Sequence, residues 1–208
     1  MPEHAPLKLK AATPFPGLPI SVEPSRAGAW VSERKPQLAT VMAYKGRRSD
    51  IFAQLKTNYA LSLPDGPQRR ANGVSAVIGL GPRTWLFQRE AGPPLEPELV
   101  EVLGDAAAVT DQSDGYGVLR LTGPLARDLL EKGVSIDLHD HVFVPGCAAV
   151  TSCMHIGVIL WRLEDDNGLA VFETAVFRSL ARSLWHFIEE SAAEFGLAVV
   201  AERAPTPI

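Results

Sequence analysis

The densest group of potential metal ligands is the stretch Asp137-Leu138-His139-Asp140-His141. Imidazole and carboxylate groups together suit Zn²⁺ or Fe²⁺. In an extended backbone His139 and His141 lie on one face, so both imidazoles can bind one ion. A third ligand must come from elsewhere, and His155 is the candidate. The favoured interpretation is a polar loop, and no metal site is predicted.

Two cysteines, Cys147 and Cys153, are the candidates for thiol chemistry. They are too far apart for a Cys-x-x-Cys motif. The run Thr151-Ser152-Cys153 lacks the glycines of a nucleophile elbow. Both thiols are therefore expected to be reduced and buried, and no catalytic residue is predicted.

Two further patterns combine groups used in acid–base or phosphate chemistry. His186 and Glu190 are four residues apart on an expected helix, which is typical of a solvated helix face. Gly79-Leu80-Gly81-Pro82 follows an expected strand, but no Gly-Lys-Ser/Thr follows it. A hairpin turn is favoured over a P-loop or dinucleotide site, so no cofactor-binding residue is predicted.

Arginines recur at Arg26, Arg47-Arg48 and Arg69-Arg70. They form an anion site only if the fold gathers them, and dispersed surface arginines are the favoured interpretation. Tryptophans are expected to anchor the core or an interface. The four are Trp30, Trp85, Trp161 and Trp185.

Composition limits the class of protein. The chain has 208 residues, a net charge of −4, 46% hydrophobic and 21% charged residues. These values exclude a disordered or coiled-coil chain and argue against a nucleic-acid binder. No apolar run reaches the length of a membrane span, and two cysteines suit a reducing compartment. A cytoplasmic protein without membrane or nucleic-acid partners is expected.

The N-terminal region differs from the rest in charge and proline content. Residues 1–50 carry eight basic and four acidic side chains, whereas residues 111–208 carry seven and fourteen. Prolines disfavour helix and central strand, so residues 1–19 are expected to form an extended arm. Such an arm either docks on something or is a solvated tail.

Elsewhere, periodicity predicts mixed α and β structure. Apolar, β-branched runs predict strands at about 38–44, 74–80, 84–88, 107–110, 117–121, 148–154, 156–163 and 169–172. Helical spacing predicts helices at about 49–55, 94–103, 122–133 and 177–194.

Strands occur in hairpins with helices between the hairpins, which favours an α+β fold with antiparallel or mixed sheets flanked by helices. Two subdomains are expected, at 20–105 and 106–200, followed by a tail at 201–208. Thr122 is expected to cap one helix, and Ser49 or Asp50 another.

The order and spacing of several motifs resemble the gamma subunit of heterotetrameric sarcosine oxidase over roughly residues 18–200. A glycine-proline helix start is shared more widely with aminomethyltransferase (T-protein) and its folate-binding relatives, which agrees with the two-subdomain α+β prediction. The motifs are Gly79-Leu-Gly-Pro-Arg-Thr-Trp-Leu86, Val109-Thr-Asp-Gln-Ser113, Val118-Leu-Arg-Leu-Thr-Gly-Pro-Leu-Ala-Arg-Asp-Leu-Leu130, Lys132-Gly133, Ile136-Asp-Leu-His139, Phe143-Val-Pro-Gly146, Ile159-Leu-Trp161 and Arg178-Ser-Leu-Ala-Arg-Ser-Leu-Trp185.

The resemblance implies a non-catalytic subunit. The family's complex oxidises sarcosine with oxygen and passes the one-carbon unit to tetrahydrofolate. It implies alpha, beta and delta subunits as partners, mainly the large alpha subunit. FAD, FMN and NAD are expected in alpha and beta, and zinc in delta. No catalytic residue of the family is carried over, and Asp140 departs from the pattern, which is expected to have proline there.

Two other functions stay open. A free-standing folate-binding or one-carbon module of the T-protein fold needs a carboxylate that contacts the pterin, and no residue stands out for that role. A small metalloprotein needs His139, His141 and a third ligand. The exact amine substrate and the interface surfaces do not follow from the sequence.

Overall fold

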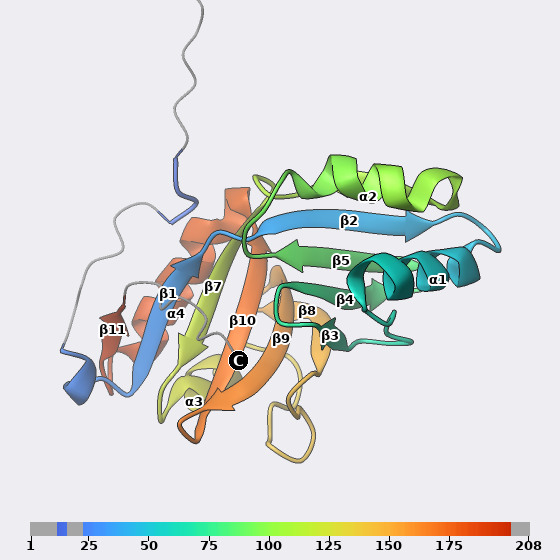
Figure 1. The fold of residues 1–208 in the computed structure, drawn as a ribbon. Coiled ribbons are helices and arrows are strands. Elements are labelled where there is room, and N and C mark those ends of the chain that lie inside the picture. Colours follow the sequence, from blue (N-terminus) through green and yellow to red (C-terminus); the bar gives the residue numbers. More distant parts are fainter. Residues whose placement is uncertain (1–11, 16–22, 201–208) are drawn as a thin grey trace, which may run out of the picture.

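Two β-sheets packed face to face form the centre of the molecule, and helices cover their outer faces (Figure 1). The computed structural model describes residues 12–15 and 23–200. The six-stranded sheet has the order β11-β1-β7-β10-β9-β8, and the five-stranded sheet has the order β3-β4-β5-β2-β6. All pairs are antiparallel except β1 with β11. The predicted α+β fold with mixed sheets is confirmed.

In the five-stranded sheet, side chains alternate between helices and the other sheet. Trp85 and Phe87 pack with α1 and α2 on one face, whereas Leu86 between them lies against the six-stranded sheet. The helices contribute Leu55 and Leu99, which are fully buried. The elements are β2 (Gln37–Ala43), α1 (Arg48–Tyr59), β3 (Arg69–Ala71), β4 (Ser75–Gly81), β5 (Thr84–Arg89), α2 (Leu95–Leu103) and β6 (Ala107–Asp111).

In the six-stranded sheet, Leu119, Leu160 and Phe172 face α3 and α4, and Trp161 faces the other sheet. The helix α4 buries Leu184 and Ile188, as its apolar spacing predicts. The elements are β1 (Ala29–Arg34), β7 (Tyr116–Thr122), α3 (Ala126–Glu131), β8 (Ala148–Cys153), β9 (Ile156–Asp166), β10 (Leu169–Phe177), α4 (Ala181–Ala192) and β11 (Leu197–Val199). Short 3₁₀ helices are η1 (Pro24–Arg26), η2 (Gly104–Ala106) and η3 (Arg178–Leu180).

Each sheet takes one strand from the opposite half of the sequence. The strand β1 pairs with β7 and β11, and β6 pairs with β2. The sheets therefore cross the expected division between 20–105 and 106–200, and that division stays a prediction. Leu38, Ile78 and Trp161 belong to one apolar cluster between the sheets. That cluster joins the two halves through a common core.

Several expected element ends are wrong. Thr122 does not cap a helix, because it pairs with Trp30 inside the sheet and α3 starts only at Ala126. Neither Ser49 nor Asp50 is the cap of α1, because this helix already starts at Arg48. The strand β10 continues through Phe177, so the expected helix at 177–194 is shorter and spans Ala181–Ala192. The strands β1, β3 and β11 were not predicted.

The expected N-terminal arm falls mostly on residues 1–11 and 16–22, which lie outside the described residues, as does the tail 201–208. The described part, 12–15, rests on the six-stranded sheet. Phe15 is 3% exposed and belongs to the core. A Cβ atom on Gly117 would lie 2.8 Å from its ring, so this glycine leaves the space that Phe15 fills. Among the described residues, no helix is long and apolar enough to cross a membrane.

Candidate functional site

In the stretch 137–141, the carboxylate of Asp140 forms ion pairs with two arginines. Asp140 pairs with Arg127 and, at 2.9 Å, with Arg162. The hydrogen bond from Arg162 lowers the pKa of Asp140 against the opposing effect of burial, and Arg127 lowers it further. The backbone N–H of His141 donates to Nδ1 of His139 at 3.3 Å. These contacts make the stretch a loop braced by arginines, as the favoured interpretation expected.

The described residues contain no group of three His, Cys, Asp and Glu side chains that is suited to a metal ion. His155 lies in the exposed turn between β8 and β9 with a φ of 70°. The structure therefore offers no third ligand for the metal hypothesis in the described ranges.

The cysteines are both free thiols, and they differ in exposure. Cys153 is 1% exposed, and burial raises the pKa of its thiol to about 12. Cys147 is half-buried rather than buried as expected, with its thiol 3.9 Å from the carbonyl oxygen of Val142. Ser152 shares a hydrogen bond of 3.0 Å with the hydroxyl of Ser135. Among the described residues, no imidazole or carboxylate is hydrogen-bonded to these thiol and hydroxyl groups.

The remaining sequence candidates occupy surface and turn positions. His186 and Glu190 are 3.2 Å apart, and both side chains are 69% exposed, as expected for a solvated helix face. The stretch 79–82 forms the end of β4 and the turn into β5, so the predicted hairpin turn is confirmed. A Cβ atom on Gly79 would lie 2.0 Å from the carbonyl oxygen of Gly66. Glycine is required there because two backbone segments approach closely.

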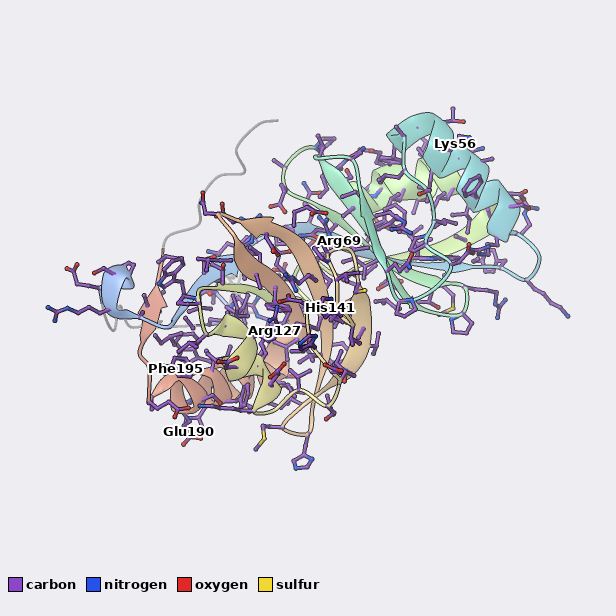
Figure 2. The ribbon with its side chains drawn as sticks, turned by 90° about the horizontal axis from the view of Figure 1, so that it is seen from below. Lys56, Arg69, Arg127, His141, Glu190 and Phe195 are labelled. Carbon is purple, nitrogen blue, oxygen red and sulfur yellow. The ribbon has the colours of Figure 1, made fainter. Side chains whose placement is uncertain are left out.

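The arginines named from the sequence do not gather into one anion site. Arg47 pairs with Asp50 and Asp105, and Arg48 pairs with Asp65, on the surface of the five-stranded half. Arg69 lies between the two sheets (Figure 2). Burial lowers the pKa of its guanidinium, and the attraction of the nearby glutamates opposes that effect.

A buried carboxylate, missed by sequence reasoning, organises the contact between the sheets. Glu173 on β10 is fully buried. Its Oε1 accepts two hydrogen bonds from Arg120, at 2.9 and 2.7 Å. Its Oε2 accepts from the indole N–H of Trp161 at 2.9 Å and from Gln88 at 3.3 Å. The Nε atom of Arg34 is 3.3 Å from Oε1. Donors from four strands in both sheets therefore converge on one acceptor.

A second glutamate completes this network. Arg34 also donates to Glu90 at 2.5 Å, and its own side chain is 1% exposed. One feature of the sequence could have revealed this network. It is a charged residue within an otherwise apolar strand, such as Arg120 or Glu173. Buried charges are nearly always paired, so each of them predicts a partner across the sheet. The network joins the two sheets through buried hydrogen bonds and ion pairs.

An open groove lies between β8, an edge strand of the six-stranded sheet, and the turn between β4 and β5 of the other sheet. Its volume is about 770 Å³, and its lining includes Arg48, Asp65, Arg83, Trp85 and Val150. Apolar residues dominate the rest of the lining, with three prolines and a leucine. Such a groove can bind a ligand or a segment of another chain.

Large apolar side chains are exposed around this groove and elsewhere. Val150 is 59% exposed, and Met42 and Tyr44 at the end of β2 are 51% and 53% exposed. Exposed apolar groups that cluster mark interaction surfaces. The other exposed large apolar residues are Phe52, Val74, Val100, Val142, Val144, Met154, Phe177 and Leu180.

Known proteins resemble this chain in sequence and structure. A family described as "Sarcosine oxidase, gamma subunit family" matches residues 48–194. The sarcosine oxidase gamma subunit of Corynebacterium sp. (strain P-1) is 36% identical over 119 residues, which cover 56% of this chain and 59% of that subunit. That match spans less than two thirds of the P-1 subunit. The gamma subunit of Corynebacterium sp. (strain U-96) is 32% identical over 152 residues, or 72% of each chain.

The fold also matches a solved structure. A chain of the heterotetrameric sarcosine oxidase from Corynebacterium sp. U-96, in complex with pyrrole 2-carboxylate, superposes with a TM-score of 0.74 at 28% identity. The superposition covers 89% of this chain and 92% of that chain. The similarity therefore extends over nearly the whole fold.

Proposed function

Because the chain belongs to the sarcosine oxidase gamma subunit family, we propose that it is a subunit, without an active site of its own, of a heterotetrameric sarcosine oxidase. The observation that supports this proposal most directly is the match over 89% of the chain to a chain of a solved heterotetrameric sarcosine oxidase. The ion pair of Asp140 with Arg162 and the burial of the Cys153 thiol are in keeping with a structural role.

In this proposal the other subunits carry the chemistry. They hold FAD, FMN, NAD, tetrahydrofolate and zinc, oxidise sarcosine or a related N-methyl amine with oxygen, and transfer the one-carbon unit to tetrahydrofolate. The partners of this chain are the alpha, beta and delta subunits, with the large alpha subunit as the main contact. The complex works in the cytoplasm.

Co-expression tests the proposal. The three other subunits are produced with and without this chain, and the mass of the complex and sarcosine-dependent peroxide formation are measured. We expect a heterotetramer that contains this chain, lower yield or activity without it, and no flavin absorbance or sarcosine oxidation by the isolated chain. A fully assembled and fully active complex that forms equally well without this chain would refute the proposal.

The alternative of a free-standing folate-binding module stays a prediction. It requires a carboxylate that is available to the pterin. Asp65 lines the groove, but it is already paired with Arg48. Calorimetric titration of the isolated chain with tetrahydrofolate distinguishes the two functions, since a structural subunit is expected to show no binding heat.

A further inference from the structure

The strand β8 has one open position on its outer edge. It is the terminal strand of the six-stranded sheet, and β9 pairs with it on the inner side only. On the outer side, the N–H of Ala148 donates to Pro67 at 2.8 Å, and the carbonyl of Ser152 accepts from Ser135 at 3.1 Å. Both ends of the edge are therefore covered by other segments of the chain.

The middle of the edge, at Val150, is uncovered. Backbone groups of alternate residues in a strand point to the same side. The N–H and C=O of Val150 therefore point outward, as those of Ala148 and Ser152 do. Among the described residues, no backbone group covers them on that side. An unpaired pair of edge groups is a template for an added strand residue from another chain.

The groove beside this edge carries an excess of positive charge. Its lining contains two guanidinium groups, on Arg48 and Arg83, and one carboxylate, on Asp65. Asp65 pairs with Arg48. The side chain of Arg83 is exposed and forms no ion pair with any described residue. The unmatched charge in the groove is therefore that of Arg83.

The position of Arg83 is set by the backbone. It occupies the turn between β4 and β5 with a φ of 61°. Its carbonyl oxygen accepts from the N–H of Ala43 at 2.9 Å, so the turn is fixed to the end of β2. The exposed side chains of Pro82 and Val150 form an apolar part of the groove wall. A carboxylate that binds Arg83 would thus lie beside an apolar surface, where charge-assisted hydrogen bonds are strong.

We propose that this groove, lined by Arg83 and the edge at Val150, binds an extended acidic segment of another subunit. The segment adds one strand residue to β8 through the N–H and C=O of Val150. An Asp or Glu side chain of the segment pairs with Arg83, and an apolar side chain contacts the exposed side chain of Val150. This inference rests on the proposed function and names the chemistry of the contact.

The test uses the complex assembled from co-expressed subunits. The variant Arg83→Glu reverses the unmatched charge, and Val150→Pro removes the outward N–H, which an edge strand tolerates. The control Arg182→Glu makes the same charge reversal at an exposed site on α4. Affinity is measured by titrating labelled gamma chain into the complex that lacks it. Thermal unfolding of each isolated variant checks the fold, and Arg83→Gln replaces Arg83→Glu if the latter is unstable.

We expect Arg83→Glu and Val150→Pro each to weaken association about 10-fold or more, and Arg182→Glu to leave it unchanged. The Arg83 effect should diminish at high salt because ion pairs are screened. If wild type and both variants associate equally, the groove proposal is overturned while the proposed function stands. If wild type itself does not associate, the proposed function fails and this inference with it. If the isolated chain binds glutarate in calorimetry and the variants still assemble, the groove is a small-anion site and the proposal is also overturned.

Discussion

The change Glu173→Gln removes the one charge on which the buried network converges. The side chain keeps its size, but the carboxylate becomes an amide whose NH₂ faces hydrogen-bond donors. Arg120 then loses its charged acceptor, and Arg34 loses its contact with the Glu173 carboxylate but keeps its ion pair with Glu90. Breaking one partner of a buried ion pair costs about 3–5 kcal/mol. Because Glu90 still neutralises Arg34, we expect a loss near the lower end, about 3 kcal/mol.

For a chain of this length, 1 kcal/mol corresponds to roughly 2–4 °C in Tm, so the loss predicts a fall of about 6–12 °C. Urea titration of the isolated chain, followed by far-ultraviolet circular dichroism, measures the free energy of unfolding. The control Glu190→Gln removes a carboxylate that is 69% exposed, and a change within about 0.5 kcal/mol is expected. A loss below about 1 kcal/mol for Glu173→Gln would refute the reasoning that this carboxylate holds the sheets together.

Other substitutions and treatments have equally specific outcomes. Gly79→Ala should destabilise by about 1–3 kcal/mol because its Cβ atom has no room, and Gly81→Ala, with nothing within 4 Å, should change little in the same urea titration. The thiol of Cys153, with a pKa raised to about 12, should resist iodoacetamide at about pH 8 in the folded chain and react after unfolding, as read by mass spectrometry. Asp140 has a pKa lowered by Arg162, so its stabilising effect is present above about pH 4 and is lost as the pH falls through the lowered value. Asp140→Asn should therefore be less stable than wild type at neutral pH, and the difference should shrink in acid; equal acid unfolding curves at all pH values would contradict this.

Periodicity predicted the elements that bury one face. The alternation around Trp85 and the helical spacing of Leu184 and Ile188 follow from burial against a single layer. The strand β1 was missed because it is flanked by proline-rich residues and contains Ser32, Glu33 and Arg34, which read as polar. Only pairing with β7 and β11, distant in the sequence, makes this segment a strand. Tertiary pairing of this kind has no local signal.

Thr122 shows why local rules also failed at an element end. The sequence Thr-Gly-Pro satisfies the rule for a helix cap, and a Cβ atom on Gly123 would lie 2.9 Å from the carbonyl oxygen of Gly28. This close approach of β1 keeps Thr122 in the strand, and the helix starts later. The same long-range pairing that hid β1 therefore moved the helix start.

The pairing of β1 and β6 with strands from the opposite half of the sequence also explains why the candidate site was not visible in the sequence. Because β1 and β6 cross between the halves, the two sheets face each other, and the edge strand β8 of one sheet lies beside the β4–β5 turn of the other. Arg83 and Val150 are distant in the sequence, and neither belongs to a recognisable binding motif. Their common groove exists only because the fold brings a sheet edge and a basic turn together, so the chemistry of association in this chain is a property of its topology.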